Sequence, residues 1–156
     1  MAKVKTEKRK PFTLAYIEHM GPYDKVPWDE YLERLYGFAK ANKAMPGFYP
    51  MAFYMNCPDD TLPKNLLTHV GIPVKGKAKE SDDVRLRKIP AMTVATISHK
   101  GPGSDFPKTY GQLNGWIEEH GYQWAGPAIE VYSKKPEKVK GKVILFAKVM
   151  APVRKR

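Results

Sequence analysis

The stretch Thr13-Leu-Ala-Tyr-Ile-Glu-His-Met-Gly-Pro22 decides the fold, because a second version of it occurs later in the chain as Thr93-Val-Ala-Thr-Ile-Ser-His-Lys-Gly-Pro102. Each version alternates in the way that is typical of a β-strand and ends in a Gly-Pro turn. An internal repeat of this kind constrains the architecture more than any single motif does. The sequence therefore predicts two copies of one small unit.

A helical pattern follows each turn. The first apolar stripe consists of Trp28, Tyr31, Leu32, Leu35, Phe38 and Ala39, and the second consists of Phe106, Thr109, Tyr110, Leu113, Trp116 and Ile117, at a constant offset of 78. Ser104 and Asp105 before Pro107 indicate the start of the second helix, and Gly121 indicates its end. Gly111 and Gly115 weaken this helix. We expect one helix per unit, with its apolar stripe facing a sheet.

Two further strands complete each copy. Residues 51–54 correspond to residues 129–132, each followed by a loop in which an acid follows proline (Pro58-Asp59 and Pro136-Glu137), and residues 69–74 correspond to residues 148–153. Repeat one spans about residues 11–74 and repeat two about residues 89–153, joined by a highly charged connector at residues 75–88. Two βαββ units joined in this way predict an α+β fold, an antiparallel sheet with two helices and internal pseudo-twofold symmetry.

The length and composition favour a single cytoplasmic domain over residues 1–156. A chain of 156 residues can bury an apolar core, and it has no apolar run of the roughly 20 residues that cross a bilayer. The only cysteine, Cys57, has no thiol partner, so we expect a reduced thiol in a loop.

The formal charge of +11 is concentrated near the ends of the chain. The first ten residues carry +4 and residues 134–156 carry +8, which leaves −1 for residues 11–133. We interpret the basic ends as a solvated fringe, and weak binding of polyanions is the alternative.

The order and duplication of these motifs resemble the GyrI-like small-molecule-binding family. The resemblance rests on the paired His-x-Gly-Pro turns (His19 to Pro22 and His99 to Pro102), on Ile129-Glu-Val-Tyr132, and on Val70-Gly-Ile-Pro-Val74. This family includes the effector-binding domains of BmrR and of Rob-type regulators and stand-alone gyrase-inhibitor proteins. The resemblance implies SHS2-type tandem repeats, a ligand cleft on the axis between them, and a stand-alone member without a DNA-binding domain.

Some stand-alone members are similar to hydrolases that open cyclopropane-bearing genotoxic compounds with an acid on the last strand of the second repeat. The aligned residue here is Lys148, and its counterpart in the first repeat is His69. A lysine cannot serve the same anionic role, so the sequence leaves open whether this protein is an enzyme.

Aromatic and titratable residues supply the candidate ligand site. The predicted ligand-binding residues are Tyr16, Tyr23, Trp28, Tyr54, His69, Trp116, Trp124, Glu130, Tyr132 and Lys148. The faces of aromatic rings suit flat lipophilic ligands. For each of these aromatic residues the alternative is ordinary packing in the core. Tyr54 and Tyr132 are favoured because they occupy equivalent positions in the two repeats.

Glu130 is the candidate catalytic residue, because it alternates with Ile129 and Val131 on an otherwise apolar strand. A partly desolvated carboxylate there would be a general acid or base, or would hold a ligand amine, and a solvated strand face is the alternative. Lys148, if buried, would pair with an acid such as Glu130, or would extend out of the sheet edge to solvent. His19 and His99 are expected to hydrogen-bond the turn backbone.

The leading interpretation is a protein that binds lipophilic small molecules between its repeats, for sensing, sequestration or detoxification. The alternatives are a hydrolase of cyclopropanoid-type electrophiles that uses Glu130, and a gyrase inhibitor or other interaction module that contacts its partner through the basic ends. The sequence lacks the P-loop, dinucleotide and zinc-binding motifs, so no cofactor or metal is expected.

Overall fold

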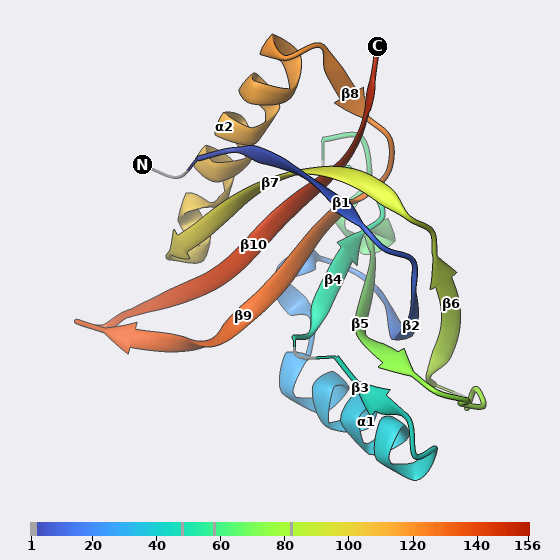
Figure 1. The fold of residues 1–156 in the computed structure, drawn as a ribbon. Helices are drawn as coiled ribbons and strands as arrows, with labels where there is room; N and C mark the ends of the chain where they lie inside the picture. Colours follow the sequence, from blue (N-terminus) through green and yellow to red (C-terminus); the bar gives the residue numbers. More distant parts are fainter. Residues whose placement is uncertain (1–2, 48, 58, 82) are drawn as a thin grey trace. The chain divides into compact units, whose positions relative to one another are not determined.

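The computed structural model describes residues 3–47, 49–57, 59–81 and 83–156, and these residues form two compact units (Figure 1). One unit comprises residues 10–91. The other comprises residues 92–156 together with the N-terminal residues up to Arg9.

The unit of residues 10–91 is an antiparallel sheet with one long helix. Its elements are β2 (Phe12–Met20), η1 (Tyr23–Lys25), α1 (Trp28–Ala41), β3 (Met45–Pro46), β4 (Met51–Tyr54), η2 (Pro63–Asn65), β5 (Leu67–Lys75) and β6 (Arg85–Ile89). The strand order is β4-β5-β2-β6, and the short strand β3 pairs with β5.

The second unit repeats this plan. Its elements are β1 (Lys5–Arg9), β7 (Met92–Gly101), η3 (Gly103–Asp105), α2 (Phe106–Glu119), β8 (Tyr122–Trp124), β9 (Ala128–Val139) and β10 (Lys142–Lys155). The strand order is β1-β7-β10-β9, and β8 pairs with β10. The prediction of a duplicated α+β unit with antiparallel strands and one helix each is confirmed.

Each helix packs on one face of its own sheet, as the apolar stripes predict. In the first unit, Leu35 and Phe38 of α1 join a buried cluster with Ile17, Val70 and Ile72 of the sheet. In the second unit, the buried cluster consists of Leu113 and Ile117 of α2 with Ala95, Ile97, Val149, Ala151 and Val153. These strand residues alternate in sequence, because only every second side chain of a strand points to a given face.

A short strand precedes each repeat in the sequence. Each of these two strands pairs with a strand of the other repeat and not with the repeat that follows it. Strand β1 precedes β2 in sequence but pairs with β7, from Lys5 opposite Thr96 to Arg9 opposite Met92. Strand β6 precedes β7 but pairs with β2 of the first unit. Residues 5–9 are therefore part of a sheet, although Lys5, Thr6 and Lys8 are exposed to solvent as the fringe interpretation expects. The charged connector likewise ends in an ordered strand.

The loop predicted at Pro136 and Glu137 is instead part of a strand. Pro136 and Glu137 lie inside β9, which continues to Val139 before the chain turns at Lys140 and Gly141. Both turn residues have positive φ, 51° and 80°. The long hairpin of β9 and β10 extends past the end of β7 in Figure 1. The last basic residues belong to the sheet as well, because Arg154 and Lys155 pair with β8.

The second helix begins and ends where its sequence predicts. The turn η3 includes Asp105, and α2 starts at Phe106. The helix ends at Glu119, two residues before Gly121, whose φ of 75° suits glycine. Among the residues that the structure describes, no helix is both long enough and apolar enough to cross a membrane.

Candidate ligand-binding site

Glu130 is a buried acid on the face of the second unit that α2 covers. It lies opposite Val149, a member of the apolar cluster under α2, and its exposed fraction is 6%. Its neighbours Ile129 and Val131 point to the other face of the sheet, as the alternation predicts. The alternative of a solvated strand face is therefore wrong for Glu130.

Two tyrosine hydroxyls hold the Glu130 carboxylate. Tyr110 of α2 donates a hydrogen bond of 2.6 Å to Oε2, and Tyr132 donates one of 2.8 Å to Oε1. Each carboxylate oxygen thus accepts a bond from a phenol, which fixes the plane of the carboxyl group. Tyr132 was predicted here. Tyr110 was missed as a site residue, although its place in the helical stripe aimed it at the sheet.

Lys148 faces away from Glu130. It pairs in register with Val131, one residue from Glu130, so the two side chains lie on opposite faces of the sheet. Its ammonium instead donates a hydrogen bond of 2.6 Å to Glu7 on β1. This hydrogen bond is the main reason why the pKa of Glu7 lies below its usual value, and Arg9 contributes in the same direction. The pairing of Lys148 with Glu130, one of the alternatives that the sequence leaves open, is therefore excluded.

Tyr23 and Tyr54 form an aromatic pair in the first unit. Their rings meet edge to face with centroids 4.8 Å apart. The Tyr23 hydroxyl donates a bond of 2.6 Å to the Asn56 carbonyl oxygen, and burial raises the pKa of this hydroxyl. Trp28, the first residue of α1, packs partly buried against the core under that helix. Tyr54 and Tyr132 occupy corresponding strands of the two units, as predicted.

Tyr16 and His69 stack on the other face of the first unit's sheet. Their ring centroids are 4.4 Å apart, and His69 is 8% exposed. Burial lowers the pKa of His69 to about 4, the positive charge of Arg87 adds to this effect, and Glu18 opposes it. The imidazole is therefore neutral at pH 7. Sequence reasoning missed Arg87, because it lies in the connector that was expected to be exposed.

Trp116 and Trp124 serve the core of the second unit. The Trp116 ring stacks on His120, at 4.1 Å between centroids, and on Tyr122, at 5.7 Å. Trp124 donates its indole N–H to Asn114 Oδ1 at 2.8 Å. Trp116 lies six residues beyond Tyr110 on α2, about 9 Å along the helix axis. The structure therefore supports the core-packing alternative for both tryptophans.

His19 and His99 connect the end of a strand to the following helix. His19 Nδ1 lies 3.2 Å from the Tyr31 hydroxyl of α1, and His99 Nδ1 lies 2.7 Å from the Thr109 hydroxyl of α2. His99 Nε2 also donates to the carbonyl oxygen of Pro102 at 3.3 Å. The expected bond to the turn backbone is confirmed at His99. His19 Nε2 is buried with no such partner among the described residues.

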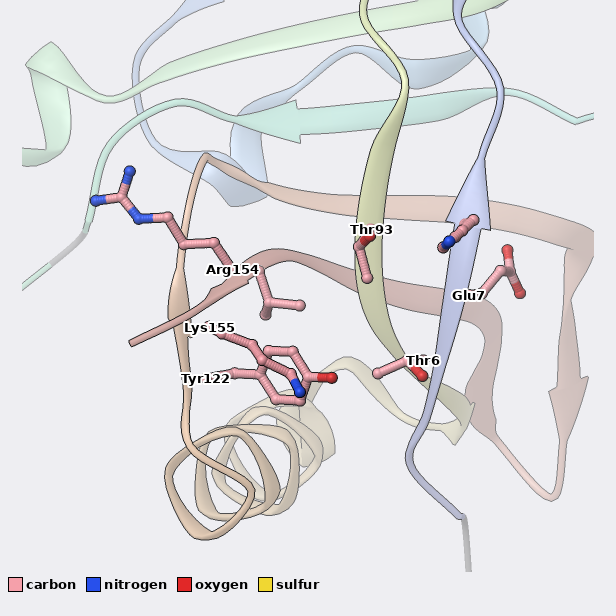
Figure 2. Close-up of a pocket in the computed structure, with 8 residues that line it drawn as sticks. Thr6, Glu7, Thr93, Tyr122, Arg154 and Lys155 are labelled. Carbon is pink, nitrogen blue, oxygen red and sulfur yellow. The ribbon is translucent and has the colours of Figure 1, made fainter.

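Two cavities lie in the second unit. One of about 330 Å³ is bounded by β1, by Tyr122 and by the last residues of β10, and Figure 2 shows Thr6, Thr93, Tyr122 and Lys155 around it. The other, of about 360 Å³, lies beside His99 and Thr109. None of the ten predicted ligand-binding residues lines either cavity.

The second unit thus holds a buried carboxylate between two tyrosine hydroxyls, in a chain of two similar α+β units. Residues 2–153 match the GyrI-like small molecule binding domain, and the chain belongs to this family. Its ligand is therefore a small molecule. No protein with a curated description matches the chain by sequence.

Solved structures share the fold at low sequence identity. The EcmrR C-terminal domain superposes with a TM-score of 0.82 at 19% identity, over 100% of this chain and 99% of that one. The EcmrR chain of an EcmrR–DNA complex matches with a TM-score of 0.80 at 20% identity, over 99% of this chain but only 58% of that one. A hydrolase from Listeria innocua matches with a TM-score of 0.71 at 12% identity, over 97% of this chain and 92% of that one.

Proposed function

We propose that this protein binds lipophilic small-molecule cations and that Glu130, Tyr110 and Tyr132 form the anchoring end of the binding site. The observation that carries the proposal is the buried Glu130 carboxylate with a tyrosine hydroxyl on each oxygen. A negative charge beside aromatic rings is the combination that recognises lipophilic cations, since the ring faces attract positive charge as well.

The position of Lys148 favours a cationic ligand. This lysine lies on the opposite face of the sheet from Glu130, and Glu7 neutralises it. It is therefore not placed to compensate the negative charge of Glu130. That the ligand occupies a cleft between the two repeats, and that binding serves sensing, sequestration or detoxification, stay predictions from the sequence.

Calorimetric titration with tetraphenylphosphonium tests the proposal, with neutral triphenylphosphine oxide as the matched ligand. We expect Glu130→Gln to weaken binding of the cation by at least tenfold, because the amide keeps the shape of the side chain and removes its charge. The control is Glu137→Gln on the same strand, an exposed acid paired with Lys134. It should change the Kd less than twofold. Equal loss in both variants, or equal affinity for the neutral compound, would contradict the proposal.

Hydrolysis is a second candidate function, favoured by the tyrosine-oriented carboxylate. A carboxylate in this geometry can act as a general base toward water, and the acid that hydrolases of the family use on the last strand is replaced here by Lys148. Product analysis after incubation with a cyclopropane-bearing electrophile tests this function. Turnover by the natural protein that Glu130→Gln abolishes would establish it, and unchanged electrophile would exclude it for that substrate. Contact with gyrase or with a polyanion through the basic ends stays an alternative from the sequence, which salt-sensitive binding would test.

A further inference from the structure

We propose that the first unit contains an anion-binding subsite at Arg87, which takes the carboxylate of a ligand with a flat aromatic body. This subsite lies on strands β2, β4, β5 and β6, on the sheet face away from α1. It shares no residue with the site formed by Glu130, Tyr110 and Tyr132, and the proposal rests on different observations.

The first observation is a pair of unsatisfied donors on Arg87. Its Nε and Nη2 atoms are buried and have no hydrogen-bond partner among the described residues, although the side chain as a whole is only partly buried. These two nitrogens share one edge of the guanidinium, and that edge matches the two oxygens of a carboxylate. Buried donors without acceptors are costly, so such a pair indicates a group that the ligand supplies.

The second observation is the way in which aromatic rings hold the guanidinium. The Arg87 Cζ atom lies 5.4 Å from the ring centroid of Tyr16 and 4.8 Å from that of Phe53. Ring faces attract the cation but accept no in-plane hydrogen bonds. The rings therefore position Arg87 without satisfying the hydrogen-bonding edge of its guanidinium. They also provide apolar surface for the aromatic body of a ligand.

The third observation is that His69, like Arg87, has a buried nitrogen without a hydrogen-bond partner among the described residues. His69 Nδ1 is buried and has no hydrogen-bond partner among the described residues, and the imidazole stacks on Tyr16. The charged groups that face it are Arg87, which disfavours its protonation, and Glu18, which lies opposite it in register and favours its protonation. Glu18 is exposed, and no ion pair between Glu18 and Arg87 occurs in the part of the chain that the structure describes.

In the second unit, the position that corresponds to Arg87 is occupied by an acid, Glu7. Arg87 faces Leu14 in register, and Glu7 faces Val94, the residue that corresponds to Leu14 in the repeat. In the same way, Lys148 occupies the position of His69. In the second unit the acid and the base therefore form an ion pair at 2.6 Å, whereas the first unit has two bases. A ligand carboxylate at Arg87 would take the place that Glu7 takes beside Lys148.

Two-dimensional NMR of the arginine Nε–Hε groups tests the subsite. The probes are 2-naphthoate, its neutral amide 2-naphthamide, and acetate as a carboxylate without an aromatic body. We expect 2-naphthoate to shift the Arg87 Nε–Hε resonance downfield in a saturable way and to raise the pKa of His69 by about one unit. We expect acetate to bind at least tenfold more weakly and 2-naphthamide to give no shift at Arg87.

Substitutions make the test specific. Arg87→Met should weaken 2-naphthoate binding at least tenfold, and Arg87→Lys should weaken it several-fold because a lysine lacks the two-nitrogen edge. The matched control is Arg85→Met, two residues away on the same strand and exposed. It should leave the Kd within twofold. Any of three results would overturn the proposal. They are an equal loss of 2-naphthoate affinity in Arg85→Met and Arg87→Met, equal affinities for 2-naphthoate and 2-naphthamide, and an Arg87 Nε–Hε resonance that 2-naphthoate does not shift in the natural protein. These readouts use anions at Arg87, so they succeed or fail independently of the cation test at Glu130.

Discussion

Lys148 in β10 donates a hydrogen bond of 2.6 Å to Glu7 in β1, and this contact ties the N-terminal strand to the sheet of the second unit. The two residues come from strands that are not neighbours, because β7 lies between them. The ion pair therefore reaches across one strand and adds a side-chain contact to the pairing of β1 with β7.

Removing the acid of this pair should destabilise the second unit modestly. We expect Glu7→Gln to lower the free energy of unfolding at pH 7 by about 1 kcal/mol, because both side chains remain partly exposed and solvent screens the pair. The pKa of Glu7 is lowered in the folded state, so its contribution is present above the ordinary value of 4.5 and is lost as the pH falls below it. Urea unfolding at pH 7 and pH 3 measures both effects. An equal difference between the two proteins at both pH values would contradict the assignment.

His69 should make the folded protein sensitive to mild acid. Its pKa in the folded state is about 4, against 6.5 when exposed, so the unfolded chain binds a proton that the folded chain does not. Stability is therefore lost as the pH falls from 6.5 toward 4, by up to about 3 kcal/mol from this residue. We expect His69→Gln to flatten the dependence of the unfolding free energy on pH in this window. Urea titrations at pH 4.5, 5.5 and 7 test this, and identical slopes for the two proteins would refute it.

Gly71 of β5 permits a close approach of two strands. A Cβ atom there would lie 2.6 Å from the Ala15 carbonyl oxygen and 2.7 Å from Leu14 Cδ1, both of which are buried. Gly71→Ala should therefore cost about 2 kcal/mol of stability, because backbone must move to accommodate the methyl group. Gly37→Ala is the control, since a Cβ at that helical position meets nothing within 4 Å. Thermal unfolding that ranks Gly71→Ala at or above the control in stability would show that the sheet adjusts freely.

The glycines of α2 should respond in the opposite direction. Gly111 and Gly115 lie inside the helix, they are exposed, and a Cβ at either position meets no atom within 4 Å. Replacing either glycine with alanine should stabilise the protein by about 0.5 to 1 kcal/mol, because alanine loses less conformational freedom in a helix. Amide hydrogen exchange in α2 should slow accordingly. Unchanged exchange would mean that opening of the helix does not depend on these residues.

Local patterns predicted the parts of the site that belong to single elements. The alternation of Ile129, Glu130 and Val131 placed the acid on the face opposite its apolar neighbours, and Tyr132 two residues later on the face of Glu130. The helical stripe likewise aimed Tyr110 at the sheet. The sequence could not show that Tyr110 and Tyr132 both donate to Glu130, because helix and strand meet only through packing.

Errors occurred where partners are distant in sequence. The sequence leaves open whether Lys148 pairs with Glu130, but one residue of register puts the two on opposite faces, and the acid that binds Lys148 lies 141 positions away. The loop predicted at Pro136 and Glu137 is wrong, because β9 continues through both residues.

The duplicated unit, the order of its strands and helices, and the apolar faces of each core can be predicted from the sequence, because they follow from the periodicity of neighbouring residues. The partners of the charged segments are visible only in the folded chain: residues 5–9 pair with β7, and residues 85–89 pair with β2. The pairing brings Glu7 to Lys148, and it places Arg87 between aromatic rings with no ion-pair partner among the described residues. Charge alone does not reveal such a difference, because the partner that a strand selects depends on contacts between residues far apart in the chain.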